Sequence, residues 1–379
     1  MRIMHARLRP DKMTRDLPIA SVLIPVYNGE VYLAEAVESA LGQTEKNIEV
    51  VLVDDGSTDS TRAILRRFAL QDARVRVFEE EHRGLVPTLN RGLEVARGKY
   101  ICRLDADDIA MPDRVEKQVR FLDAHEDYVL VGGQDILIGE AGETIGLREH
   151  PLSHVEVKKE LRDSCCFTHT SVMLRRAEAL SAGGYDPLFF HAEDYDLWVR
   201  LAAKYRLGNL PDIVCRVRMR ENSTSSSGLL RQMFTAMCIR ASFRGASRET
   251  IRESVQVGKK DFFPVLRRLG FQNDEIAGYV SGGYLYWAAR FRSMGNLETA
   301  LKLVSEATEH LHELKCDSLY LARVYSLGIL VSLDARNYTR AARFLLLALA
   351  SSPGETTRRV FKRLSTRLSS GRKRVQTAS

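Results

Sequence analysis

The chain has 379 residues, more than the roughly 100–200 residues of a typical domain, so we expect two domains or one large domain with an appendage. Hydrophobic residues make up 45% and charged residues 28% of the chain, proportions that exclude collagen-like, disordered and multi-span membrane proteins. The net charge of +7 comes from residues 351–379, where eight Lys or Arg stand against one Glu. We therefore predict no nucleic acid as a partner of the rest of the chain.

The sequence predicts a cytoplasmic protein. The N-terminal segment at 1–15 is basic and lacks the apolar stretch of a secretory signal, and no apolar run reaches the ~18 to 20 residues needed to cross a bilayer. The cysteines show no C-x-x-C spacing, which favours free thiols in a reducing compartment. The six are Cys102, Cys165, Cys166, Cys215, Cys238 and Cys316.

Between Ile19 and Val131, short apolar runs alternate with amphipathic segments, a pattern that predicts a doubly wound, mostly parallel α/β sheet. Strands are predicted at 21–27, 48–53, 75–78, 100–104 and 129–132. Helices are predicted at 30–41, 58–69, 85–96 and 114–124. In the first of these helices we expect Val31, Ala34, Val37 and Leu41 to share one buried face.

After Leu152 the pattern is mixed, with helices predicted at 155–161 and 193–204. The Ser-rich stretch at 221–228 predicts a loop or domain boundary, and the chain beyond Leu229 predicts an all-α region. Two segments there, Asn296–Ala307 and Asn337–Ala348, resemble the second helix of a tetratricopeptide repeat. Their alanines lie 41 residues apart where the repeat has 34, so a plain helical bundle is an equal alternative.

Three acidic clusters follow or interrupt apolar sequence: Asp54-Asp55, Asp105-Ala106-Asp107-Asp108 and Glu193-Asp194-Tyr195-Asp196. Ligands of open α/β sheets bind beyond the carboxyl ends of the strands, where the first two clusters are predicted to lie. Carboxylates there suit Mg²⁺ or Mn²⁺ held together with diphosphate oxygens. Each cluster alone could instead cap a helix or form an Asx turn, but three in one crevice favour a metal site.

Other nucleotide-binding patterns are missing from the sequence. There is no G-x-x-x-x-G-K-[ST] loop and no G-x-G-x-x-G after the first predicted strand, so P-loop and dinucleotide-binding proteins lose their main support. The pair Asp54-Asp55 also fits a phosphoacceptor receiver domain. That hypothesis leaves the two downstream acidic clusters unexplained.

Five segments in order resemble the family 2 glycosyltransferases, inverting enzymes of GT-A fold. They are ASVLIPVYN at 20–28, VDDGSTD at 53–59, DADD at 105–108, GGYD at 183–186 and EDYDLW at 193–198. The resemblance implies transfer of a sugar from a nucleotide-sugar donor in a single displacement. It divides the chain into a basic extension at 1–17, a GT-A domain at 18–225, a helical accessory region at 226–355 and a basic tail at 356–379.

The resemblance also implies roles for individual residues in donor binding. Pro25 and Tyr27 would line the nucleotide pocket, and Asp55 would accept a hydrogen bond from the uracil of a UDP-sugar. Asp107 would bind the Mg²⁺ or Mn²⁺ that bridges the diphosphate. Asp105 would face the nucleoside or sugar beside that metal, with Asp108 as a nearby alternative ligand.

For the transfer step, the resemblance implies that Asp194 is the catalytic base, with Glu193 beside it. Gly183 and Gly184 would let the backbone approach the donor sugar or acceptor. Direct displacement needs a base for the proton of the acceptor hydroxyl and a cation for the departing nucleoside diphosphate, so separate carboxylates suit the two tasks.

The sequence departs from the family where a Tyr-Arg-x-His pattern is expected. The corresponding stretch is Cys215-Arg216-Val217-Arg218, with Arg218 in place of the histidine. A guanidinium cannot bind a metal but can pair with phosphate, so our hypothesis is that Arg218 or Arg220 contacts the diphosphate. A solvated basic strand end is an equal alternative.

Two hypotheses concern partners. The segment Arg358–Arg374 mixes basic residues with Val360, Phe361, Leu364 and Leu368, a pattern that fits an amphipathic helix at the cytoplasmic membrane face or a disordered basic tail. The family implies a cell-envelope polysaccharide or a lipid-linked oligosaccharide as the acceptor. The alternative to an enzyme is a non-catalytic nucleotide-sugar-binding scaffold whose helical region binds a protein partner.

Overall fold

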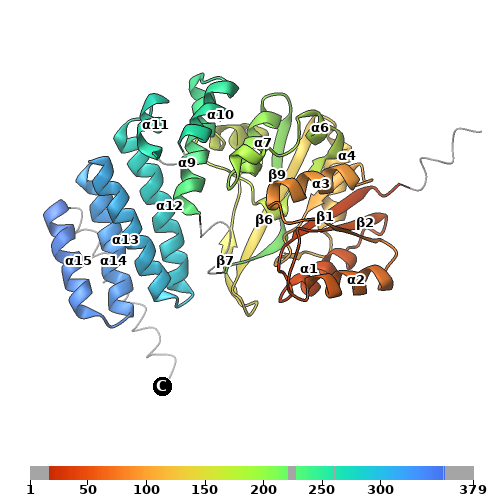
Figure 1. The fold of residues 1–379 in the computed structure, drawn as a ribbon, viewed down its shortest axis with the longest axis horizontal. Helices are drawn as coiled ribbons and strands as arrows, with labels where there is room; N and C mark the ends of the chain where they lie inside the picture. Colours follow the sequence, from red (N-terminus) through yellow and green to blue (C-terminus); the bar gives the residue numbers. More distant parts are fainter. Residues whose placement is uncertain (1–16, 221–227, 259–260, 353, 355–379) are drawn as a thin grey trace, which may run out of the picture. The chain divides into compact units, whose positions relative to one another are not determined.

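The computed structural model describes residues 17–220, 228–258, 261–352 and 354 (Figure 1). The chain divides into two compact units, Met1–Met219 and Arg220–Ser379. The boundary predicted between residues 225 and 226, residues 1–16 of the predicted extension and the whole basic tail at 356–379 lie outside the described residues.

In the described part of the first unit, nine strands form one sheet in the order β3-β2-β1-β4-β8-β6-β9-β5, with β7 paired to β6. The strands β3, β2, β1 and β4 are parallel, β8 is antiparallel to β4 and β6, and β9 is parallel to β6. The strands are β1 Ala20–Val26, β2 Ile48–Asp54, β3 Val75–Glu79, β4 Tyr100–Arg103, β5 Ile109–Ala110, β6 Tyr128–Ile138, β7 Thr144–Arg148, β8 Met173–Arg175 and β9 Arg206–Arg218. The predicted α/β class with a doubly wound, mostly parallel sheet is confirmed.

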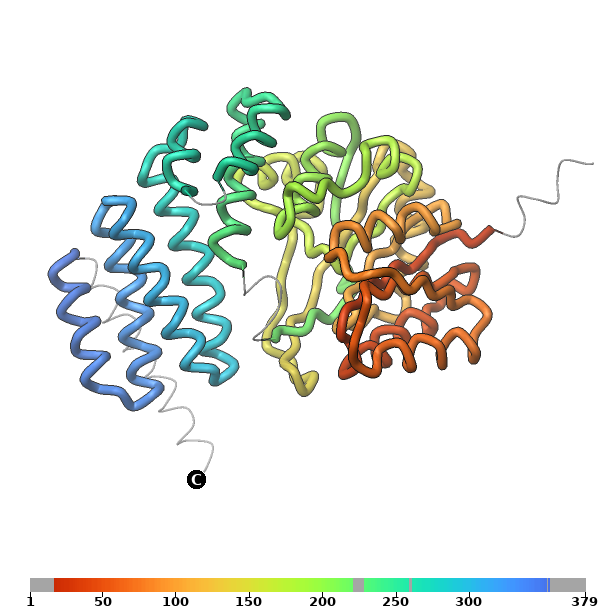
Figure 2. The backbone as a smooth tube through the Cα atoms, viewed as in Figure 1, coloured from red at the N-terminus to blue at the C-terminus, as the bar shows by residue number. Residues whose placement is uncertain are grey.

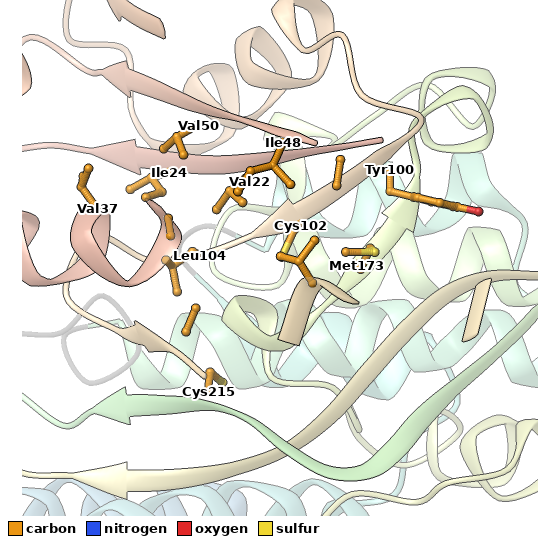
Figure 3. Close-up of a cluster of buried hydrophobic side chains, with 14 of the residues drawn as sticks. Val22, Ile24, Val37, Ile48, Val50, Tyr100, Cys102, Leu104, Met173 and Cys215 are labelled. Atoms are coloured by element: carbon orange, nitrogen blue, oxygen red, sulfur yellow. The ribbon is translucent and has the colours of Figure 1, made fainter. Parts of the chain in front are cut away.

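Helices cover both faces of the sheet because successive side chains of a buried strand point to opposite sides. Val22 and Ile24 of β1 pack in one cluster with side chains of α1, α2 and α4, as Figure 3 shows for Val37. Leu23 points to the other face, where Gly92 of α3 approaches it. The helices are α1 Leu33–Leu41, α2 Thr61–Gln71, α3 Leu85–Val95, α4 Arg114–Ala124, α5 His154–Glu160, α6 Arg176–Ser181 and α7 Glu193–Ala202.

The strand register brings the ligand-side ends of three strands to one edge. On one side of β1, Val26 pairs with Asp54 of β2, and on the other side Leu23 pairs with Arg103 of β4. Tyr27, Asp55 and Asp105 therefore all follow the carboxyl ends of adjacent strands. Because β1 lies between β2 and β4, Asp55 and Asp105 are separated by about two strand spacings, about 10 Å.

The prediction for the first helix was wrong at its start. The helix begins at Leu33, and Val31 is 74% exposed. The backbone N–H groups of residues 28–30 donate to Ser57, Thr61 and Asp59, so side chains of the β2–α2 segment hold this stretch as a loop. The buried face is formed by Leu33, Ala36, Val37 and Ala40.

The strand predicted at 129–132 is longer than expected, and β9 was not predicted. Residues 132–135, Gly-Gly-Gln-Asp, interrupt the apolar pattern of β6, yet Gln134 and Asp135 pair with β9 and carry buried polar side chains. A polar residue inside a central strand hides the strand from a pattern based on hydrophobicity.

The described part of the second unit is all-α, as predicted. Its helices are α9 Leu229–Arg240, α10 Arg248–Val257, α11 Phe262–Arg268, α12 Asn273–Ser293, α13 Leu297–Leu314, α14 Ser318–Asp334 and α15 Tyr338–Ser351. Consecutive helices from α12 to α15 pack side by side (Figure 2). The side chains of Asn296 and Asn337 cap α13 and α15. The tetratricopeptide-like repeat stays a prediction.

The close approach of α3 to β1 makes a stability prediction. A Cβ atom on Gly92 would lie 2.1 Å from Leu23 Cδ1, and Leu23 is fully buried. We expect Gly92→Ala to lower the free energy of unfolding by about 1 kcal/mol or more, because overpacking costs about 1–3 kcal/mol and outweighs the gain in helix propensity. Urea unfolding followed by circular dichroism measures the change.

The matched control is Gly282→Ala in α12, where a Cβ atom would meet nothing within 4 Å. This substitution should raise stability by up to about 1 kcal/mol. Equal gains for the two substitutions would contradict the described packing of α3 on β1.

Candidate active site

Three carboxylates gather in the loop between β4 and β5. Asp105, Asp107 and Asp108 offer oxygen atoms that all lie within 4.8 Å of one another. Burial, followed by the neighbouring charges of Asp107 and Asp105, raises the pKa of Asp108 well above its usual value. An all-oxygen donor set suits Mg²⁺ or Mn²⁺, and a divalent cation would offset the repulsion among these groups. The residues present therefore fit the metal that the sequence predicts.

A buried arginine, Arg103, stabilises this loop through an ion pair. The guanidinium of Arg103, at the end of β4, pairs with the carboxylate of Asp105, and its side chain is only 2% exposed. Thr170 Oγ1 accepts a hydrogen bond of 2.9 Å from the backbone N–H of Asp105. Among the described residues, Nε and Nη1 of Arg103 have no hydrogen-bond partner. Arg103 was not predicted as a site residue. A basic residue at the end of a predicted apolar strand could have indicated that it belongs to the site.

The structure shows contacts of Arg218 that the sequence did not predict. Its side chain is 2% exposed, and its backbone N–H donates to Asp108 Oδ1 at 2.7 Å. Its Nε donates to the carbonyl oxygen of Asp107 at 3.0 Å, its Nη2 to Glu35 Oε2 at 2.5 Å, and its Nη1 to the carbonyl oxygens of residues 139–140. Four of the five N–H groups of this buried guanidinium therefore already donate to groups of the protein. We propose instead that Arg218 positions the metal-binding loop.

The predicted nucleoside residues lie at the ends of β1 and β2. Pro25 is buried inside β1 and pairs with Val53. It can therefore support the predicted nucleotide pocket, but its ring is not exposed to a ligand. Tyr27 is 47% exposed and stacks on His82, with 4.1 Å between the ring centroids. Asp55 is buried and accepts hydrogen bonds from the backbone N–H groups of Arg83 at 2.8 Å and Gly84 at 2.9 Å.

The predicted base lies in the first turn of α7. Burial raises the pKa of Asp194 to about 6 and the pKa of Glu193 to about 8, while the positive charge of Arg103 lowers both values. The negative charge of Asp105 also raises the pKa of Asp194. Asp194 Oδ1 accepts a hydrogen bond of 2.7 Å from the backbone N–H of Tyr195. The predicted base is therefore influenced by two charges near the metal-binding loop. Asp105 raises the pKa of Asp194, and Arg103 lowers it.

Gly183 and Gly184 have a role in the fold that the sequence did not predict. Both have positive φ, 88° and 65°, and their N–H groups close the C-terminal turn of α6. A Cβ atom on Gly184 would lie 2.6 Å from Asn90 Oδ1. Asn90 and Arg200 hydrogen bond to this turn at Tyr185 and Gly184. The two glycines thus end α6, and Gly184 lets this turn pack closely against Asn90 of α3. Their approach to a donor sugar or acceptor stays a prediction.

Comparison with known proteins identifies the family. The family model described as Glycosyl transferase family 2 matches residues 21–184. The amylovoran biosynthesis glycosyltransferase AmsE of Erwinia amylovora is 37% identical over 202 residues, which are 52% of this chain and 75% of that protein. The chain belongs to glycosyltransferase family 2. An uncharacterized glycosyltransferase of Haemophilus influenzae is 35% identical over 204 residues, again 52% of this chain and 75% of that protein.

Solved structures also align with this glycosyltransferase. The mannosyltransferase PcManGT from Pyrobaculum calidifontis, in complex with GDP-Man and Mn²⁺, is 19% identical, with a TM-score of 0.49 and coverage of 88% of this chain and 86% of that chain. S. aureus TarS 1–349 in complex with UDP-GlcNAc is 18% identical, with a TM-score of 0.48 and coverage of 89% and 92%.

The contacts of Arg218 predict how this glycosyltransferase responds to its loss. Arg218→Ala should lower the free energy of unfolding by about 2–3 kcal/mol, because several polar groups around it lose their partner. Arg216→Ala is the matched control on the same strand, since Arg216 donates to one carbonyl oxygen, that of Gly142. The control should cost less than about 1 kcal/mol in urea unfolding.

Nucleotide binding separates the two hypotheses for Arg218. A positioning residue predicts that stability and metal-dependent nucleotide affinity fall together in Arg218→Ala. Unchanged stability with a selective loss of diphosphate affinity would restore the direct phosphate contact.

Proposed function

We propose that this family 2 glycosyltransferase transfers a sugar from a nucleoside diphosphate donor, a UDP-sugar in our hypothesis, to a hydroxyl group of its acceptor with inversion at the anomeric carbon. The observation that carries the proposal is the placement of three mutually close carboxylates after β4, on the same sheet edge as Asp55 after β2. That edge can hold a nucleoside at one point and a metal-bound diphosphate about two strand spacings away.

Asp107 and Asp105 are the residues that we propose to hold Mg²⁺ or Mn²⁺, with Asp108 beneath them. When bound, the cation would supply positive charge that stabilises the departing diphosphate. Asp108 is fully buried and accepts the backbone N–H of Arg218, so its task in the proposal is to shape the loop. Asp105 and Asp107 are both less buried, which leaves their oxygen atoms accessible to a ligand.

Asp194 is our proposed base for the proton of the acceptor hydroxyl. A pKa of about 6 leaves it ionised at neutral pH and more basic than an ordinary aspartate. Glu193, with a pKa of about 8, would keep its proton at neutral pH, so the pair carries one negative charge. Arg103 stabilises that negative charge in a buried site, because its positively charged guanidinium lowers the pKa of both groups.

The acceptor that we propose is a cell-envelope polysaccharide or a lipid-linked oligosaccharide. AmsE, a relative of this chain, is named for amylovoran biosynthesis, which supports a biosynthetic acceptor.

No helix among the described residues is long and apolar enough to span a membrane. All six cysteines are free thiols, as the sequence predicted. A membrane contact of the basic tail and a protein partner for the helical unit stay hypotheses.

The base assignment makes a testable prediction for activity. Asp194→Asn should lower kcat by about 10²–10⁴-fold, the usual contribution of a positioned general base. The matched control is Glu193→Gln, which should cost far less because an amide resembles a protonated carboxyl group. Release of nucleoside diphosphate from a panel of UDP- and GDP-sugars, with water or an envelope lipid extract as acceptor, measures both variants.

The same assay should depend on pH. The base acts when it is ionised, so kcat/KM should be full above the pKa of about 6 and fall as the pH drops through that value. Wild-type rates in Asp194→Asn, or a rate that does not fall below pH 6, would contradict the role of Asp194.

A further inference from the structure

The outer side of α15 in the second unit is apolar. This helix is the last described member of the row from α12 to α15 (Figure 1), and it packs on α14 through Phe344, Leu345 and Ala348. On its other side, exposed apolar residues recur every three or four positions, so they form one stripe along the helix. The α15 stripe consists of Tyr338, Ala342, Leu346 and Leu349, of which Tyr338 is 68% and Leu346 70% exposed. A contiguous apolar patch indicates a binding surface, unlike apolar residues scattered singly.

The charged side chains of α15 are all positive. Arg340 and Arg343 are both exposed, and the sequence from Arg336 to Gly354 contains no Asp or Glu. Residues 336–379 hold eleven Lys or Arg and one Glu, whereas residues 1–335 hold 45 Lys or Arg and 48 Asp or Glu. The positive excess of the chain therefore begins at this helix. The α15 stripe is an apolar surface that is bordered by positive charge.

Charge separates the possible occupants of the α15 stripe. A second copy of the chain in a symmetric contact would meet this surface with the same positive surface. The basic tail at 356–379 carries eight Lys or Arg and no acidic residue, so it would also bring positive charge to positive charge. An anionic lipid bilayer supplies the opposite charge at its headgroups and an apolar interior for the leucine side chains. The bilayer is therefore the occupant that fits both properties of the stripe.

We propose that the outer side of α15 is a membrane-binding surface for an anionic bilayer. Leu346 and Leu349 enter the boundary between headgroups and acyl chains, while Arg340 and Arg343 pair with the lipid headgroups. Tyr338 has an apolar ring and a polar hydroxyl group, which suits the membrane–water interface. This surface lies on a described helix, so it is distinct from the hypothesis for the basic tail, and it does not depend on the proposed transfer reaction.

Co-sedimentation of the full chain with lipid vesicles tests the proposal. The wild type should bind vesicles of phosphatidylcholine mixed with phosphatidylglycerol about tenfold or more tightly than vesicles of phosphatidylcholine alone. Leu346→Asp should weaken binding to the mixed vesicles by about tenfold or more, because an inserted leucine is lost and a negative charge is added. Leu70→Asp is the matched control, since Leu70 of α2 is 89% exposed, and it should bind like the wild type.

A fluorescence measurement keeps the test independent of any loss of folding in Leu346→Asp. Leu346→Trp places an indole ring in the α15 stripe, and its emission should shift to shorter wavelength when mixed vesicles are added. Leu70→Trp should show no such shift.

Three outcomes would overturn the membrane-binding role of α15. Equal vesicle binding by Leu346→Asp and Leu70→Asp would leave the basic tail as the membrane contact. Stronger vesicle binding by Leu346→Asp would show that the stripe holds the tail and that the substitution releases it. A wild type that ignores vesicles but forms dimers, which Leu346→Asp dissociates in sedimentation velocity, would assign the stripe to a second copy.

Discussion

The parallel pairing of β1 with both β2 and β4 is the constraint on which the site depends. β1 pairs with β2 along its whole length and with β4 over Ala20–Leu23, and its side chains are buried on both faces of the sheet. The register fixes where Tyr27, Asp55 and Asp105 leave the sheet, so one edge receives the exposed aromatic ring and two acidic segments. Loops of different length then add the remaining groups without changing that spacing.

The site concentrates negative charge in a place that is poorly solvated. Five carboxylates, those of residues 105, 107, 108, 193 and 194, belong to it, and burial is the largest cause of the raised pKa of Asp108, Glu193 and Asp194. Arg103 is the buried cation among them, and it has donors without partners among the described residues. Such an arrangement of buried charges costs stability in the free protein, as is common at functional sites, and a bound cation would offset the repulsion among the carboxylates.

The sequence predicted the parts of this molecule that local patterns encode. The parallel strands, the helices α3 and α4 and the acidic segments at strand ends follow from hydrophobic period and turn chemistry. The contacts of Arg218 join residues 78 to 183 positions apart in the sequence. The packing of Gly184 against Asn90 and the stack of His82 on Tyr27 join residues 94 and 55 positions apart, so only the folded chain shows them. The start of α1 failed for the same reason, since side chains from the β2–α2 segment hold residues 28–30.

We propose that the carboxylates after β4 bind a metal that in turn holds a nucleoside diphosphate. The decisive measurement is titration calorimetry of the full chain with UDP and GDP, each with and without Mn²⁺, on the wild type and on Asp107→Asn. We expect tight binding of one nucleotide with Mn²⁺, much weaker binding without it, and loss of the metal effect in Asp107→Asn. Nucleotide binding that is equally strong without metal, or unchanged in Asp107→Asn, would show that these carboxylates do not hold a metal-bound diphosphate.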